Sequence, residues 1–296
     1  MNYQEEFLEY LKKEKRMARN TQEAYHRDAV DFCRFLKERG LEDPAAAGNP
    51  DVLSFLTGLR KAGRSAATIN RKLASIRAFY TFLMQEGIIS SNPAQNVRPP
   101  KVERKKLEYL TLDEVDRLLR TPDGSVLGRR DRALMELLYA TGIRVNEVIA
   151  ANVEDVNLRI GFFTCTGETG KARIIPIGRP ARAALEEYIY ETRGELVKGE
   201  DAEKEKALFV NFYGKRLTRQ GLWKILGEYG QKAGIEKKMT PHLLRISFAV
   251  HMVQNGADLK SLQELLGHED MTATQVYLSV TKNRIKDVYD KTHPRA

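Results

Sequence analysis

The feature that most constrains this chain is an interruption of its helical pattern near residue 100. Residues 91–106 read Ser-Asn-Pro-Ala-Gln-Asn-Val-Arg-Pro-Pro-Lys-Val-Glu-Arg-Lys-Lys, with three prolines and five cations. Proline fixes φ and has no amide hydrogen, so a continuous helix cannot cross this stretch. We therefore expect two domains, residues 1–90 and 108–296, joined by a linker over residues 91–107. The linker is either a solvated spacer or a basic strap along a phosphate backbone.

Both parts of the chain are mostly helical in pattern. In residues 3–90 apolar side chains recur every three or four positions, as at Tyr25, Ala29, Phe32 and Leu36, and four helices are expected. After the break, Thr111-Leu-Asp-Glu114 is a capping box that opens a helix. Further helices are expected near residues 127–139, 144 onward, 179–192, 218–234, 242–255, 259–266 and 272–278.

A small β structure interrupts the second helical part. Phe162 to Thr166 and Arg173 to Ile177 predict a hairpin around Gly-Glu-Thr-Gly, and Leu208 to Phe212 predicts one more short strand. The fold class expected is therefore mainly α with a small β-hairpin or sheet, which makes the second domain α+β.

Composition narrows the class of partner. With 42% hydrophobic residues the chain can pack ordinary cores, and a net charge of +9 favours polyanions. Cys33 and Cys165 are the only cysteines, so we expect no disulfide framework and no zinc site, and a reducing cytoplasm. We expect no signal peptide at the N-terminus and no membrane-spanning segment.

Five side chains in the second domain could together attack a phosphodiester without a metal: Arg144, His242, Arg245, His268 and Tyr277. His242 and Arg245 lie three positions apart, so on a helix they could reach one phosphate. Pro241 suits the first turn of that helix, where free amides favour an anion.

Each position also has an ordinary explanation. Arg144 could form an ion pair with Glu147, and a single HxxR sequence is usually a solvent-facing turn. His268 could cap a helix C-terminus, and Tyr277 could simply be half-buried.

In combination, these motifs resemble the tyrosine recombinase (phage integrase) family, and within it the Xer recombinases. Four stretches match the family in order: Ala-Thr-Gly-Ile-Arg144-Val-Asn-Glu, Pro-His242-Leu-Leu-Arg245, Leu-Leu-Gly-His268 and Ala-Thr-Gln-Val-Tyr277. The resemblance itself spans the whole chain. The resemblance implies an N-terminal four-helix, SAM-like core-binding domain and a recombinase catalytic domain that form a C-shaped clamp on DNA.

The resemblance also implies a mechanism for site-specific recombination. Tyr277 attacks the scissile phosphate and forms a 3′-phosphotyrosyl link. Arg144 and Arg245 donate to the non-bridging oxygens, while His242 and His268 bind the phosphate or assist proton transfer. No cofactor and no metal are implied.

The partners implied are double-stranded DNA and further recombinase subunits. By resemblance, a homo- or hetero-tetramer holds two DNA sites, with a second Xer-type recombinase and a DNA translocase as further partners. The biological role that the resemblance implies is resolution of chromosome or plasmid dimers at cell division. Candidate DNA-contacting cations are Arg64, Arg71, Lys72, Arg77, Lys101 and Arg104.

One position departs from the family pattern. The family places a catalytic Lys in the hairpin turn, where this chain has Glu168. An ionised carboxylate cannot donate a proton, and it repels a phosphodiester. Three interpretations stay open: Lys171 replaces the missing acid, cleavage is slow without it, or the chain is a DNA-binding accessory paralogue that no longer recombines.

We predict that Lys171→Ala reduces DNA cleavage far more than DNA binding. Loss of one general acid costs roughly 10²- to 10⁴-fold in rate. Cleavage and binding are measured on the same DNA substrate, and unchanged cleavage would refute the catalytic role of Lys171.

Overall fold

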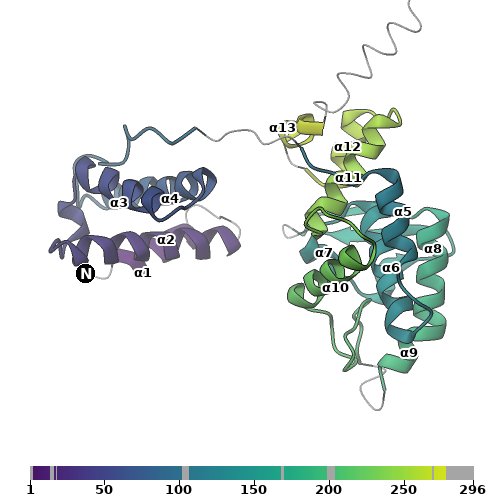
Figure 1. Ribbon diagram of the computed structural model, residues 1–296. Coiled ribbons are helices and arrows are strands. Elements are labelled where there is room, and N and C mark those ends of the chain that lie inside the picture. Colours follow the sequence, from purple (N-terminus) through teal and green to yellow (C-terminus); the bar gives the residue numbers. More distant parts are fainter. Residues whose placement is uncertain are drawn as a thin grey trace, which may run out of the picture. The chain divides into compact units, whose positions relative to one another are not determined.

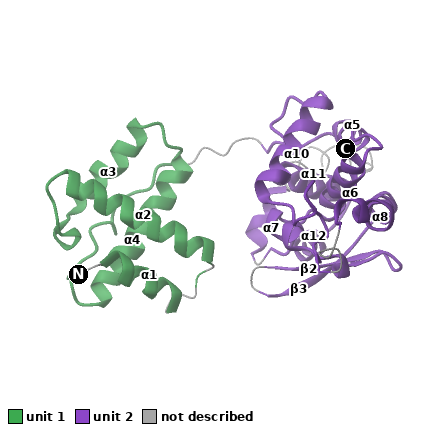
Figure 2. Ribbon diagram, turned by 90° about the horizontal axis from the view of Figure 1, so that it is seen from below, with its two compact units in different colours: residues 1–105 green, residues 106–296 purple. Residues whose placement is uncertain are grey.

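The computed structural model divides into two compact units, Met1–Lys105 and Lys106–Ala296 (Figure 2). It describes residues 3–13, 17, 19–101, 107–167, 170–198, 204–268 and 270–277. Each unit buries its own apolar core, so each is described by itself. In the described part of the chain, no helix is long and apolar enough to cross a membrane.

Unit 1 is a bundle of four helices, as the apolar spacing predicted (Figure 1). They are α1 (Tyr3–Lys13), α2 (Arg19–Glu38), α3 (Asn49–Lys61) and α4 (Ala66–Gln85), with a 3₁₀ turn, η1 (Pro44–Ala46), before α3. Aromatic rings interlock in the core: Phe79 packs edge-on against Phe7, and Tyr80 packs edge-on against Phe32. The N-cap residue of α4 is Ser65, whose side chain accepts a hydrogen bond from the amide of Thr68.

The first part of the expected linker packs on unit 1. Ala94 and Val97 are buried, and their carbonyls accept hydrogen bonds from the Arg77 guanidinium. The Asn70 amide donates to the Pro100 carbonyl at 3.1 Å. The polypeptide from residue 91 to 100 is therefore a part of unit 1, although its prolines do interrupt the helix. Residues 102–106 lie outside the described residues.

Unit 2 is built around α6 (Val126–Thr141), which packs against α5 (Leu112–Arg120), α8 (Arg179–Glu186) and α11 (Pro241–Gln254). The capping box expected before α5 is present, with Thr111 and Glu114 each accepting from the other's backbone amide. The other helices are α7 (Val145–Ala150), η2 (Val153–Asp155), the π-helix η3 (Glu187–Thr192), α9 (Arg193–Leu196), α10 (Arg219–Lys232), α12 (Leu259–Leu266) and α13 (Met271–Gln275).

The sheet of unit 2 is antiparallel, in the order β1-β2-β3. The expected hairpin forms from β2 (Phe162–Thr166) and β3 (Ala172–Pro176), with Phe163 opposite Ile175 and Cys165 opposite Arg173. The two-residue β1 (Val156–Asn157) extends it and was not anticipated. Residues 208–212 were expected to form a strand, but they form only an isolated bridge between Val210 and Arg216.

Two glycines end helices that lead into the candidate site. Gly142 caps α6 with φ of 59°, and Gly267 caps α12 with φ of 62°. This left-handed conformation is unfavourable for residues with a Cβ atom. A Cβ on Gly142 would also lie 2.4 Å from a ring carbon of Phe248.

We predict that Gly142→Ala lowers the free energy of unfolding by at least about 1–2 kcal/mol, because of the left-handed φ and the contact with Phe248. Urea denaturation of the purified chain measures the change. Gly227→Ala is the matched control, since Gly227 lies in α10 with open space around its Cα. Alanine there should raise stability by about 0.5–1 kcal/mol. Equal stability of the two variants would contradict the argument.

Candidate active site

Arg144 is placed by the turn that joins α6 to α7. It is the N-cap residue of α7, and its backbone amide donates to Glu147 Oε2 at 2.7 Å. Its guanidinium donates to Glu147 Oε1 at 3.2 Å and to the Gly267 carbonyl at 2.8 Å. The ion pair with Glu147 is thus real, yet 44% of the Arg144 side chain stays exposed. The remaining N–H groups of Arg144 can still bind an anion.

The helix α11 carries the next two candidates. Thr240 caps it, Pro241 opens it, and His242 and Arg245 follow in its first turns. Arg245 is buried and donates to the carbonyls of Gly142 and Leu266. His242 lies exposed at the helix start, and its ring makes no hydrogen bond to another described residue. The pKa of His242 is lowered by partial desolvation of the ring and by the charge of Arg245, so the ring is neutral at pH 7.

The C-terminal end of α12 is where these side chains converge. Its last carbonyls are the groups that a helix leaves without partners, and they carry the negative end of the helix dipole. Three guanidiniums bind three successive carbonyls, each at 2.8 Å: Arg173 at Leu265, Arg245 at Leu266 and Arg144 at Gly267. The helix end thereby holds three cations from three separate elements in one place.

His268 follows directly and has one defined tautomer. Arg245 Nη2 lies 2.9 Å from His268 Nε2, and a guanidinium can only donate, so Nε2 is the acceptor. The proton must then be on Nδ1, which lies 2.9 Å from Thr274 Oγ1. Burial and the positive charges nearby, above all that of Arg245, lower the pKa of His268 to about 4.

Tyr277 follows α13 and is 5% exposed. It belongs to a small apolar cluster with Phe248, Leu262 and Leu266, against which Tyr109 also packs. Burial raises the pKa of the Tyr277 phenol, and the charges of Arg245 and Arg144 act in the opposite direction. The phenol is therefore protonated at rest, and the two guanidiniums favour its ionised form.

The net charge of the site is positive. Burial alone would raise the pKa of Glu147, but hydrogen bonds from Arg173 and from the Arg144 backbone hold it at about 2. Burial and the charge of Arg144 lower the pKa of Arg245 to about 10, which leaves it charged at neutral pH. One carboxylate thus faces three guanidiniums, and the excess charge suits a phosphate.

The structure brings together Arg144, Arg245, His268 and Tyr277, and places His242 close to Arg245. Lys171 is exposed at the end of the hairpin turn, and its side chain has no ion pair with another described residue. Glu168, at the usual position of the family lysine, lies outside the described residues. That Lys171 takes the role of the family lysine therefore stays a prediction.

Sequence reasoning missed Arg173. It lies on β3 opposite Cys165, whose side chain is buried, and only 15% of the Arg173 side chain is exposed. A strand that alternates sides places Arg173 and Ile175 on the same, inward face. An arginine at an inward strand position was the signal that could have identified it.

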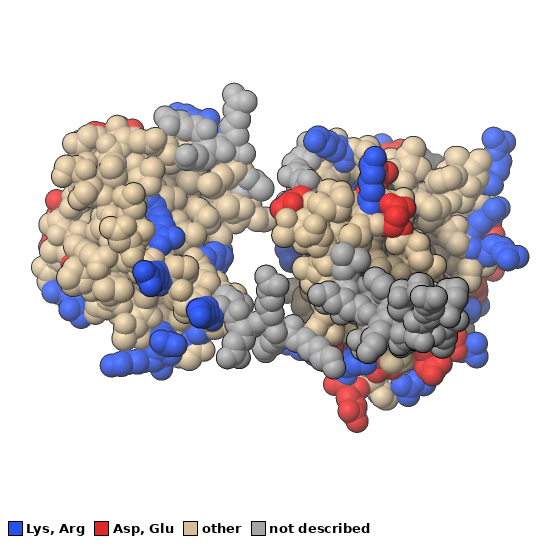
Figure 3. All heavy atoms as spheres, turned by 90° about the horizontal axis from the view of Figure 1, so that it is seen from above, with Lys and Arg blue, Asp and Glu red and all other residues tan. Residues whose placement is uncertain are grey.

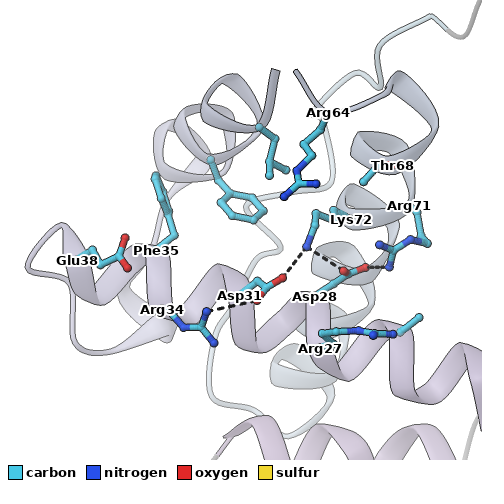
Figure 4. A pocket seen from close by; sticks show the side chains of 13 residues that line it. Arg27, Asp28, Asp31, Arg34, Phe35, Glu38, Arg64, Thr68, Arg71 and Lys72 are labelled. Carbon is cyan, nitrogen blue, oxygen red and sulfur yellow. Dashed lines mark hydrogen bonds and ion pairs between the residues drawn. The ribbon is translucent and has the colours of Figure 1, made fainter. Parts of the chain in front are cut away.

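The cations predicted to contact DNA all belong to unit 1, and Figure 3 shows several lysines and arginines on one face of that unit. An open groove of about 750 Å³ between α2, α3 and α4 is lined by Arg27, Arg34, Arg64, Arg71 and Lys72 (Figure 4).

Some of these cations already have internal partners. Lys72 binds Asp28 at 3.0 Å and Asp31 at 2.8 Å, and Arg71 also binds Asp28. Arg77 binds backbone carbonyls, as described above. Lys101 is exposed, and Arg104 lies outside the described residues.

Comparison with known families decides what the chain is. The model of the phage integrase family matches residues 108–284, and the phage integrase N-terminal SAM-like domain matches residues 5–87. The chain belongs to the phage integrase family. These two matches correspond to the two units of the structure and span all five residues of the site.

Relatives within this family share most of the sequence length. A tyrosine recombinase XerD of Oceanobacillus iheyensis is 46% identical over 296 residues, covering 99% of this chain and 98% of that protein. A tyrosine recombinase XerD of Listeria monocytogenes is 44% identical over 294 residues, with coverage of 99% and 98%.

Solved structures of family members share the fold. The XerA recombinase superposes with a TM-score of 0.56 at 26% identity and covers 99% of both chains. The XerH recombinase bound to a palindromic difH substrate superposes with a TM-score of 0.74 at 22% identity, covering 90% of this chain and 78% of that one.

We predict that His268 makes the protein less stable in mild acid. Its folded pKa of about 4 lies below the ordinary value of 6.5, so on acidification the unfolded chain takes up the proton first. The free energy of unfolding should fall between pH 7 and 5 by about 1–2 kcal/mol more in the wild type than in His268→Gln. Urea denaturation at the two pH values measures this, and equal losses would contradict the lowered pKa of His268.

Proposed function

We propose that this chain is a site-specific DNA recombinase that cuts and rejoins DNA through a 3′-phosphotyrosyl intermediate. The observation that carries the proposal is the convergence of Arg144 and Arg245 on the end of α12, where Leu266 belongs to the same apolar cluster as Tyr277. A phenol is a poor nucleophile unless its negative charge and that of the phosphate are both offset. Two fixed guanidiniums beside it meet that requirement.

Arg245 has donors left for the phosphate. A guanidinium has about five N–H bonds, and three are directed to Gly142, Leu266 and His268. The Nε–H and one Nη1–H are left for non-bridging oxygens. Since the carbonyls fix the plane of the group, these donors are oriented before substrate arrives, which is the arrangement that lowers the barrier most.

The proton of Tyr277 needs an acceptor during attack, and we propose His242. Both ring nitrogens of His268 already have partners, whereas the His242 ring is neutral at pH 7 and has no hydrogen bond to a described residue. His268 then acts by orienting Arg245. Transfer of the phosphoryl group to Tyr277 breaks the bond to the 5′-oxygen, which leaves with a proton from Lys171.

The reverse reaction completes strand exchange. The 5′-hydroxyl of a partner strand attacks the phosphotyrosyl bond, and Tyr277 leaves as the phenol. The bond to tyrosine keeps the phosphodiester's free energy, so the rejoining step needs no nucleotide hydrolysis.

Double-stranded DNA is the proposed substrate, which agrees with the XerH recombinase structure, solved with a palindromic difH substrate bound. We further propose a homo- or hetero-tetramer on two sites, a second Xer-type recombinase and a translocase as partners, and resolution of chromosome or plasmid dimers at cell division. The cytoplasm is the compartment proposed, since Cys33 and Cys165 are both buried free thiols.

We predict that the purified chain forms a covalent adduct with a suicide substrate nicked beside the cleavage point, and that Tyr277→Phe forms none. The adduct is detected as a shifted band on a denaturing gel. Tyr190→Phe is the matched control, because Tyr190 is 75% exposed in unit 2, and it should react like the wild type. Specific DNA binding without an adduct at any protein concentration would instead identify a silent accessory paralogue.

A further inference from the structure

Arg173 and Glu147 form the most closely paired ion pair of the site. Two nitrogens of Arg173 each bind one carboxylate oxygen of Glu147 at 2.8 Å, in the bidentate geometry that holds such pairs most firmly. The Arg144 guanidinium reaches the same carboxylate through one nitrogen only, at 3.2 Å, while the Arg144 backbone amide donates to it at 2.7 Å. Glu147 therefore has a strong partner in Arg173 and a weaker one in the Arg144 guanidinium.

This division matters because Glu147 and a phosphate would compete for Arg144. The side chain of Glu147 is 3% exposed, so water stabilises its charge very little. Without Arg173, the buried carboxylate would have Arg144 as its main counter-charge and would hold that guanidinium closely. Arg144 would then have fewer N–H groups and less net charge to offer a phosphate.

Arg173 also fixes the surroundings of His268. Its Nε binds the Leu265 carbonyl, and its guanidinium lies so close to Gly267 that a Cβ there would come within 2.8 Å of Nη1. Arg173 is the second residue of β3, two positions after Lys171 in the hairpin turn, so this contact ties the start of β3 to the end of α12.

We propose that Arg173 is a positioning residue for the cleavage reaction. It neutralises Glu147 and clamps the end of α12, so that the Arg144 guanidinium stays available to the scissile phosphate. This inference rests on the proposed recombinase function, and it assigns Arg173 no contact with DNA.

The first test is Arg173→Met, which keeps the length of the side chain and removes its charge. Single-turnover adduct formation on the suicide substrate should slow by about 10- to 100-fold, because small displacements of a phosphate-binding group have effects of that size. The DNA dissociation constant should change less than about threefold, since Arg173 does not touch the substrate. Arg173→Lys keeps the charge but not the bidentate geometry, and its rate of adduct formation should lie between those of the wild type and Arg173→Met.

The decisive test is a second substitution, Glu147→Gln, in the Arg173→Met background. Glutamine keeps an oxygen that can accept from the Arg144 amide, but it has no charge to hold the Arg144 guanidinium. The double variant should form the adduct at least about fivefold faster than Arg173→Met. Such a non-additive effect is expected only for coupled residues. A double variant as slow as Arg173→Met, or slower, would overturn the proposal.

Arg193→Met is the matched structural control. Arg193 is also a partly buried arginine that binds backbone carbonyls, those of Glu205 and Ala207, with no contact to the site. It should lose stability in urea but keep its cleavage rate. If the wild type forms no adduct, the proposed function fails. If the wild type reacts and Arg173→Met is as fast as Arg193→Met, only the inference about Arg173 fails.

Discussion

The whole site depends on the capping of one helix end. The carbonyls at the end of α12 would be without partners in the interior, and arginines from β3, α11 and the turn before α7 bind them. A buried carbonyl without a partner costs about 1–3 kcal/mol, so each contact favours the native arrangement. The same contacts hold like charges close together, which is costly without an anion. The stability of the helix end and the proposed affinity for phosphate therefore have a common origin.

Unit 2 arranges its elements around this point. Both turns that enter the site end in left-handed glycines, Gly142 and Gly267, and the carbonyl of each accepts from an arginine of the site. His268 is held between Arg245 and Thr274, so its tautomer follows from the helix capping. The buried carboxylate of Glu147 offsets part of the positive charge of Arg144 and Arg173. The orientations of Arg144, Arg245 and His268 are thus a consequence of backbone geometry.

Much of this could be predicted from the sequence, because helix periodicity, capping residues and reactive side chains leave local signals. The four helices of unit 1 and the hairpin were expected from such signals. The five residues of the site were proposed from their combination, and their catalytic roles stay a prediction. The carbonyl contacts could not be predicted, since Leu265 and Leu266 signal only apolar packing and their backbone acceptors leave no trace. The strand β1 is too short for a pattern. The prolines near residue 100 marked the interruption, but nothing local showed that Ala94 and Val97 are buried against α4.

The burial of Tyr277 has a consequence for the chain at rest. Only 5% of the residue is exposed, so hardly any of the proposed nucleophile lies at the surface. Contact with DNA is therefore not enough for breakage: either the backbone phosphate must settle deep into the site, or α13 must shift. An unintended nick is a danger to a chromosome, and enclosure of the nucleophile makes random encounters harmless.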